Sequence, residues 1–189
     1  MISWLVENKP YKSMVYFQLT CHQHNTIVVS MVPDLIDING APWRVLPPGL
    51  HWATLAEVEI AFAQNPHRRR LFAGLQLAAV ALKVAGCKYL FLDGSYVTGK
   101  PKPGDFDGCW SPEGVDPSLL DPVLLDFSNS RRNQKIKFLG ELFPFHLEAA
   151  PGKAFLDFFQ IEKHSGGQKG IVAIDLTIES FNTVEGGTS

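Results

Sequence analysis

Two carboxylates separated by a single residue are the strongest chemical signal in this sequence. Asp105 and Asp107 flank Phe106 in the segment DFDGCW, which has the short apolar character of a buried strand. Because residues i and i+2 of a strand point to the same face, we expect the two carboxylates to project side by side while Phe106 points into the core. Such a pair repels unless a cation lies between its members, and its hard oxygens suit Mg²⁺ or Mn²⁺. The pair therefore predicts a divalent metal site.

A glycine-serine step comes shortly before these carboxylates. Gly94 and Ser95 close an apolar run, and nine residues separate Ser95 from Asp105. Gly94 allows the backbone to approach a phosphate closely, and Ser95 adds a hydroxyl and an amide at the expected start of a helix or turn, where dipoles favour anions. The loop between the two motifs contains Lys100 and Lys102, which are available to neutralise phosphate charge. A metal-bound nucleoside triphosphate is the ligand that this combination indicates.

This arrangement resembles the signature of the DNA polymerase β-like nucleotidyltransferase superfamily, in which Gly-Ser or Gly-Gly precedes an Asp-x-Asp/Glu strand. Three blocks between Leu46 and Leu176 resemble small stand-alone members from an uncharacterised bacterial group: LPPGLHWATLAEV, LDGSYVTGKPKPGDFDG and KAFLDFFQIEKHSGGQKGIVAIDL. The resemblance covers about two thirds of the chain. One departure is Asp93, which stands before Gly94 where the superfamily usually has an apolar residue. The geometry of the turn at Gly94 is therefore open.

The resemblance also implies a third carboxylate on a neighbouring strand. We favour Glu141, which opens the segment ELFPFHLEA, with Glu148 at its other end and Asp157 as alternatives. Asp157 lies in an apolar helical block, which favours a structural role for it. A further alternative is that none of the three is catalytic. The predicted catalytic and metal-binding residues are Asp105, Asp107 and Glu141, and the predicted nucleotide-binding residues are Gly94, Ser95, Lys100 and Lys102.

The reaction that the resemblance implies is transfer of a nucleoside monophosphate from a nucleoside triphosphate to an acceptor hydroxyl, with release of pyrophosphate. The acceptor is open between a protein side chain, an RNA end such as that of tRNA, and a small molecule. Analogy with toxin and antitoxin pairs favours protein or tRNA. Two other interpretations compete: a catalytically inactive binding protein of the same fold, such as a toxin-antitoxin component, and a structural one in which both aspartates are solvated turn residues.

The elements that must position these residues alternate between helix and strand after a helical entry. This pattern predicts an α/β or α+β fold, a small mixed β-sheet flanked by helices, consistent with the nucleotidyltransferase fold. Thr54 and Glu57 form a capping box that begins the first helix. The expected helices cover residues 54–64, 67–85, 116–127 and 154–161, and the expected strands cover residues 26–31, 88–93, 105–110, 142–147 and 170–178.

Composition limits the class of protein. The 189 residues are 46% hydrophobic, enough for one core, and we expect an N-terminal extension and arm at residues 1–45, a nucleotidyltransferase-like domain at 46–180 and a disordered tail at 181–189. A net charge of −2 argues against a duplex DNA partner. The basic run at residues 67–70 is a solvated face or, alternatively, a phosphate or RNA contact.

Cysteine usage and hydropathy indicate a reduced, cytoplasmic protein. The three cysteines have no zinc-ligand spacing, and Cys21 with His22 and His24 lacks a second ligand cluster, so we expect no zinc. We also expect no signal peptide and no membrane partner, because no apolar run is long enough to span a bilayer. The sequence gives no indication of the oligomeric state or of which nucleoside triphosphate binds.

Overall fold

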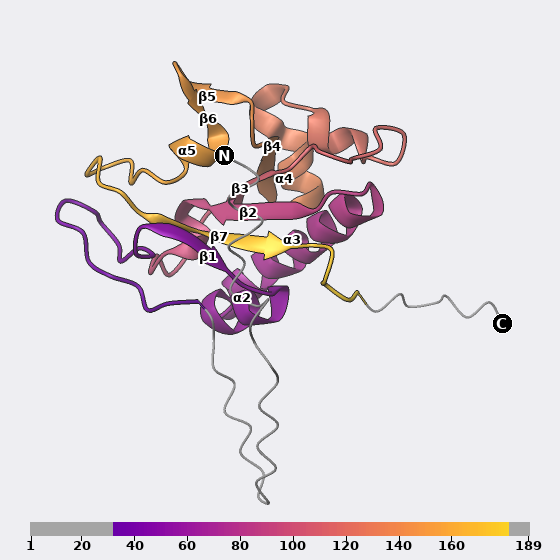
Figure 1. Cartoon of the computed structure of the whole chain (residues 1–189). Helices are drawn as coiled ribbons and strands as arrows, with labels where there is room; N and C mark the ends of the chain where they lie inside the picture. The colour runs from indigo at the N-terminus through magenta and orange to yellow at the C-terminus, as the bar shows by residue number, and fades with distance from the viewer. Residues whose placement is uncertain (1–31, 182–189) are drawn as a thin grey trace, which may run out of the picture.

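A mixed five-stranded sheet is the centre of the fold (Figure 1). The computed structural model describes residues 32–181. The strand order is β1-β7-β2-β3-β4, with β1 parallel to β7, β3 parallel to β4, and β2 antiparallel to both β7 and β3. The strands are β1 (Gly49–Trp52), β2 (Tyr89–Asp93), β3 (Phe106–Trp110), β4 (Gly140–Pro144) and β7 (Gly170–Asp175). This confirms the mixed sheet that the sequence predicts.

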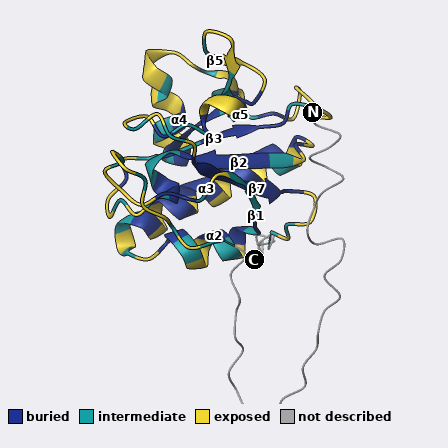
Figure 2. Ribbon diagram, turned by 60° about the vertical axis from the view of Figure 1, so that its left-hand side comes forward, coloured by how far each residue is buried: buried dark blue, intermediate teal, exposed yellow. Residues whose placement is uncertain are grey.

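Two helices cover one face of this sheet. Helix α2 (Leu55–Phe62) begins at the predicted capping box, in which Thr54 Oγ1 accepts from the Glu57 amide and Glu57 accepts from the Thr54 amide. Helix α3 (Pro66–Val84) begins at an Asn65 cap with proline in its first turn. Their buried side chains pack on alternate strand residues, including Leu90, Leu92 and Phe106, to form the main core (Figure 2).

The opposite face of the sheet has a second, smaller apolar cluster. Its buried members include Phe91, Cys109 and Phe159. The short helix α5 (Phe155–Phe158) and a two-stranded sheet made of β5 (Glu148–Ala150) and β6 (Lys153–Ala154) accompany this face (Figure 1). The acidic residues described below lie on this second face, because they alternate with the core-facing residues of the same strands.

Several predicted boundaries were wrong. The helix expected at 116–127 is absent: only a 3-10 helix, η3 (Pro122–Leu125), forms there, because Asp116 and Asp126 accept from the amides two residues later and so build turns. The helix expected at 154–161 is limited to α5, and the strand expected at 142–147 begins earlier and ends earlier, at β4. Strand β1 and the helix α4 (Arg132–Phe138) were not predicted.

The other expected segments lie toward the two ends of the chain. The proline-rich segment 33–50 folds back through an isolated antiparallel bridge between Ile36 and Val45, with a turn and bends between them, and it leads into β1. The expected strand at 26–31 and most of the expected tail lie outside the described residues. Between residues 32 and 181, no helix combines the length and apolarity that crossing a bilayer requires.

Candidate functional site

Three carboxylates stand in a row across three neighbouring strands. Asp107 of β3 pairs in register with Asp93 of β2 on one side and with Glu141 of β4 on the other. Residues paired in this way point to the same face with their side chains close together. Asp105 lies two residues before Asp107, just before β3 begins, and Phe106 between them is fully buried in the core, as the alternation of a strand predicts. The predicted residues Asp105, Asp107 and Glu141 are thus neighbours at one edge of the sheet.

The two outer members of the row each have a cationic partner. Asp93 forms a buried ion pair with Lys169, whose Nζ also donates to the Phe159 carbonyl at 2.6 Å. This pair explains how an acidic residue occupies the buried position before Gly94, where the resemblance described above leads us to expect an apolar side chain. Glu141 is also buried and accepts from Arg131, with Nε at 2.7 Å and the terminal nitrogen at 2.6 Å. Both outer charges are therefore compensated within the protein.

The middle member, Asp107, has no such partner in the part of the chain that the structure describes. Within residues 32–181 its carboxylate forms no hydrogen bond and no ion pair. Burial, followed by the charges of Asp105, Asp93 and Glu141, raises the pKa of Asp107 to about 7. The row thus has excess negative charge at its centre, which is the position where an added cation is most stabilising.

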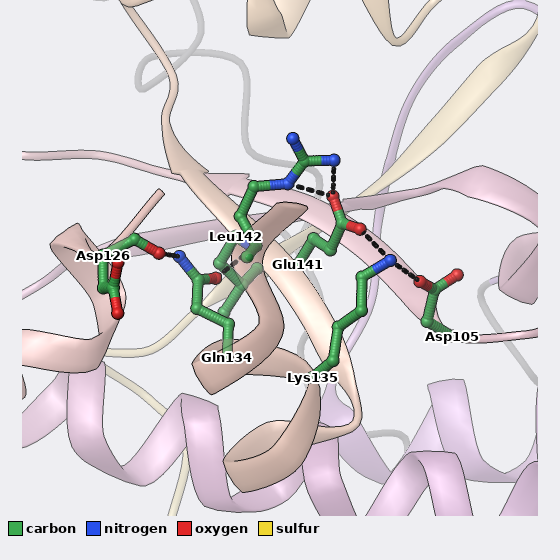
Figure 3. A network of polar contacts seen from close by, with 7 residues as sticks. Asp105, Asp126, Gln134, Lys135, Glu141 and Leu142 are labelled. Atoms are coloured by element: carbon green, nitrogen blue, oxygen red, sulfur yellow. Dashed lines mark hydrogen bonds and ion pairs between the residues drawn. The ribbon is translucent and has the colours of Figure 1, made fainter. Parts of the chain in front are cut away.

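Among residues 32–181, Lys135 is the one cation that forms ion pairs with two carboxylates of the site (Figure 3). Its Nζ lies 3.1 Å from Asp105 Oδ2 and also forms an ion pair with Glu141 Oε1. The hydrogen bond to Glu141, and then the one to Asp105, keeps the pKa of Lys135 above its ordinary value. The ammonium therefore spans two of the three predicted metal ligands.

Helix α4 and the residue before it position Lys135 and Arg131, and this geometry was not predicted from the sequence. Gln134 is completely buried and its Oε1 accepts from the Leu142 amide at 2.8 Å, which ties α4 to the strand that carries Glu141 (Figure 3). Three consecutive non-glycine residues in the left-handed region, Asn129, Ser130 and Arg131, precede the helix. Left-handed backbone costs roughly 1–2 kcal/mol per residue, so this entry is strained. The Gln134 hydrogen bond and the left-handed residues before α4 together direct Arg131 and Lys135 toward the acids.

The phosphate-binding turn predicted at Gly94 and Ser95 lies directly against the row. Gly94 has φ +72°, and a Cβ placed on it would lie 1.8 Å from Asp107 Oδ2, so this position requires glycine. Residues Gly94–Val97 form a 3-10 helix, η2. The Ser95 carbonyl accepts from Thr98 Oγ1 at 2.8 Å, while its hydroxyl has no partner in the described part of the chain. The backbone at Gly94 therefore lies so close to the acidic row that no residue with a side chain fits there.

A buried arginine fastens the loop that follows this turn. Arg68 donates to the carbonyls of Phe62 at 2.5 Å and Lys100 at 2.7 Å, and also to those of Tyr96 and Thr98. Within the basic run at 67–70, Arg68 is thus a structural clamp rather than part of a solvated face. Arg69 and Arg70 remain exposed, as that interpretation expects.

The other predicted residues lie outside the acidic row. Lys100 and Lys102 lie on the loop between η2 and β3, and neither forms an ion pair within residues 32–181. Glu148, the alternative third acid, is exposed on β5 and accepts from the Gly152 amide. Asp157 is exposed on α5 and lines a cavity of about 530 Å³ together with Lys169 and other polar residues. Neither alternative joins the row, which leaves Glu141 as the carboxylate beside Asp107.

The carboxylates of the row are of the right chemical type for a divalent cation, but their present arrangement does not form a metal site among the described residues. As the side chains stand, no group of three or more His, Cys, Asp or Glu residues between 32 and 181 is arranged to hold a metal ion. Lys135 spans Asp105 and Glu141 instead. Carboxylate oxygens are the ligand type that Mg²⁺ and Mn²⁺ prefer, and Asp107 has no ion pair among residues 32–181, so the donor chemistry suits such an ion while the positions of the side chains do not yet form a site.

Comparison with known proteins identifies a family and no function. No curated protein matches the chain, and neither does any solved structure. A family described as being of unknown function, DUF6932, matches residues 40–175. The match covers all five strands of the main sheet, Arg131 and Lys135, and the whole acidic row. The chain belongs to this family of unknown function, DUF6932.

Proposed function

We propose that the protein is a metal-dependent nucleotidyltransferase that moves a nucleoside monophosphate from a nucleoside triphosphate to an acceptor hydroxyl. The observation that carries the proposal is the acidic row, in which Asp107 is a direct strand neighbour of Glu141 and lies against the Gly94 turn. On this proposal, the mixed sheet and its helices are the nucleotidyltransferase fold that the sequence resembles.

The proposed ligands of Mg²⁺ or Mn²⁺ are Asp105, Asp107 and Glu141. When bound, the ion supplies charge neutralisation at the phosphates and lowers the pKa of the acceptor hydroxyl. Gly94 admits the triphosphate close to the backbone, and the Ser95 hydroxyl, which has no partner among the described residues, donates to a phosphate oxygen. Lys100 and Lys102 add positive charge on the same loop.

The acceptor remains a protein side chain, an RNA end or a small molecule. The cavity beside Lys169 offers polar groups of both kinds, donors and acceptors, from Lys153, Gln160 and Gln168. Lys169, which also lines the cavity, is paired with Asp93, the residue directly before Gly94, so one side chain connects the cavity wall with the proposed phosphate turn. A polar acceptor group is the chemistry that this lining suits.

A second candidate function is a binding protein of the same fold without turnover, such as one component of a toxin-antitoxin pair. The observation that favours it is that the Glu141 carboxylate already forms ion pairs with Arg131 and Lys135. A third carboxylate is needed mainly for the chemical step, so an acid held in this way is compatible with binding alone.

A labelled-nucleotide transfer assay separates the two. The purified chain is incubated with each α-labelled nucleoside triphosphate and Mg²⁺ or Mn²⁺, with the protein itself, total tRNA and the products of neighbouring genes as acceptors. Metal-dependent label on an acceptor together with released pyrophosphate is the expected result. Metal-dependent triphosphate binding without transfer to any acceptor supports the binding protein, and absence of both excludes the two together.

A further inference from the structure

The position of Lys135 indicates more than neutralisation of the acids. Its Nζ lies 3.1 Å from Asp105 Oδ2 and pairs with Glu141 Oε1, so it stands between two of the carboxylates proposed to bind the metal (Figure 3). We propose that Lys135 is an internal counter-ion that occupies the metal position in the ligand-free protein and must leave before a divalent cation can bind. This inference rests on the proposed function, because it assumes that Asp105, Asp107 and Glu141 form the metal site.

The ammonium of Lys135 is free to move into solvent, whereas helix α4, which carries it, is held in place. The Lys135 side chain is 41% exposed, whereas Glu141 is only 7% exposed. Helix α4 is held by the buried side-chain amide of Gln134, which accepts from the Leu142 amide. It also contacts α3 at Gly74, where an added Cβ would lie 2.0 Å from the Phe138 carbonyl oxygen. Rotation of the flexible lysine stem into solvent therefore opens the site without any movement of α4.

The two cations beside Glu141 do not have equivalent roles. Arg131 binds Glu141 through two nitrogens, lies 5.5 Å from the centre of the Phe143 ring, and has no ion pair with Asp105 among the described residues. It therefore holds one oxygen of Glu141 from the side. Lys135 contacts the other oxygen and reaches Asp105 as well. Only Lys135 spans the carboxylates, so only its removal exposes both of them to an incoming ion.

Competition between Lys135 and a divalent cation lowers the apparent metal affinity of the free protein. An ion must displace an ammonium that already interacts with two carboxylates, and that interaction is lost on binding. Metal alone should therefore bind weakly. A metal that arrives with a triphosphate also brings phosphate oxygens with which the released ammonium can pair, so the ligand pair overcomes the competition that the bare ion does not.

The test is a titration with Mn²⁺ alone, followed through the electron paramagnetic resonance signal of the free ion at low ionic strength. We compare the full-length chain with Lys135→Met and with the matched control Lys137→Met. Lys137 lies two residues further along α4, is similarly exposed, and pairs with Asp121 rather than with the row. Both substitutions remove one positive charge, so the general change in protein charge is the same. Lys135→Arg restores the charge at the site.

Lys135→Met should bind Mn²⁺ at least about tenfold more tightly than the wild-type chain, and the other two variants should remain within about threefold of it. In chelator, Lys135→Met should melt at a lower temperature than the wild-type chain because Asp105 and Glu141 have lost a cation, and Mn²⁺ should remove that difference. If the wild type binds Mn²⁺ and the two Met variants bind it equally, Lys135 is not a competitor and the metal site stands. If neither the wild type nor Lys135→Met binds Mn²⁺, the counter-ion and the proposed metal site are both overturned.

Discussion

Asp107 and Glu141 are direct partners in the parallel register of β3 and β4, and Asp93 is the partner of Asp107 on the opposite side. Three carboxylates therefore share one face of the sheet, at one end of three neighbouring strands. Lys169 compensates Asp93, while Arg131 and Lys135 compensate Glu141. The middle acid is left without an ion pair among the described residues, and this asymmetry is the basis of the following predictions.

Asp107→Asn should stabilise the metal-free protein while it removes metal-dependent ligand binding. Burial and the neighbouring acids raise the pKa of Asp107 to about 7, so its ionised form is unfavourable in the folded state. Replacing it by a neutral isostere should raise the free energy of unfolding at pH 8 by about 1–2 kcal/mol. Urea denaturation in chelator measures the stability, and a Mg²⁺-dependent triphosphate titration measures binding.

The same substitution has a defined pH dependence. Because the folded-state pKa of Asp107 lies above its unfolded value, the folded state binds the extra proton between about pH 4 and pH 7. Wild-type stability should therefore fall as the pH rises through this range relative to Asp107→Asn, and the two proteins should become similar near pH 4. A wild-type chain that is as stable as Asp107→Asn at pH 8 would contradict the view of Asp107 as an uncompensated acid.

Gly94→Ala should prevent the turn from lying against the acids. The added methyl group would meet Asp107 Oδ2 at 1.8 Å, and φ is +72°, so the variant should lose at least about 1–2 kcal/mol of stability. Triphosphate binding should be lost with it. Gly104→Ala is the matched control, because that glycine has a conventional φ and no atom within 4 Å of the added carbon. Thermal melting and a triphosphate titration on both variants check the prediction, and wild-type binding by folded Gly94→Ala would exclude the close approach.

Arg68→Met should destabilise the protein by about 2–4 kcal/mol, because two buried and two partly buried carbonyls lose a charged donor at once. Arg69→Met and Arg70→Met, its exposed neighbours, should change stability by no more than about 0.5 kcal/mol. Urea denaturation compares the three. The structural role assigned to Arg68 would be wrong if Arg68→Met unfolded at the same urea concentration as the two controls.

Glu141→Gln should separate binding from chemistry. Asp105 and Asp107 remain to hold metal and triphosphate, while the third carboxylate is lost, so triphosphate affinity should be retained and transfer should fall by at least about 100-fold. Glu148→Gln is the control, because Glu148 is exposed on β5 and lies outside the row. The transfer assay described above provides the readout. Equal transfer by Glu141→Gln and Glu148→Gln would remove Glu141 from the site.

Sequence alone predicted the features that depend on local chemistry. The capping box at Thr54, the start of α3 after Asn65, and the strand from Phe106 are each determined by neighbouring residues, through backbone amides that need a partner or through alternation of apolar side chains. Asp105 and Asp107 could be placed together for the same reason, since their spacing along one strand fixes the face that they share. Where side chains compete with helix formation, as at Asp116 and Asp126, apolar spacing alone was misleading.

Tertiary structure decided how those carboxylates are balanced. Glu141 becomes a neighbour of Asp107 only through the register of β3 and β4, which was one of several pairings compatible with the sequence. Lys169 reaches Asp93 across a separation of 76 residues, and Lys135 reaches Asp105 from a helix whose entry is left-handed at three residues. Charge compensation depends on distances between side chains from different elements, and these distances are set by packing of the whole fold. Residue spacing along the chain therefore identifies the acids, while only the folded chain determines which of them lacks a cation.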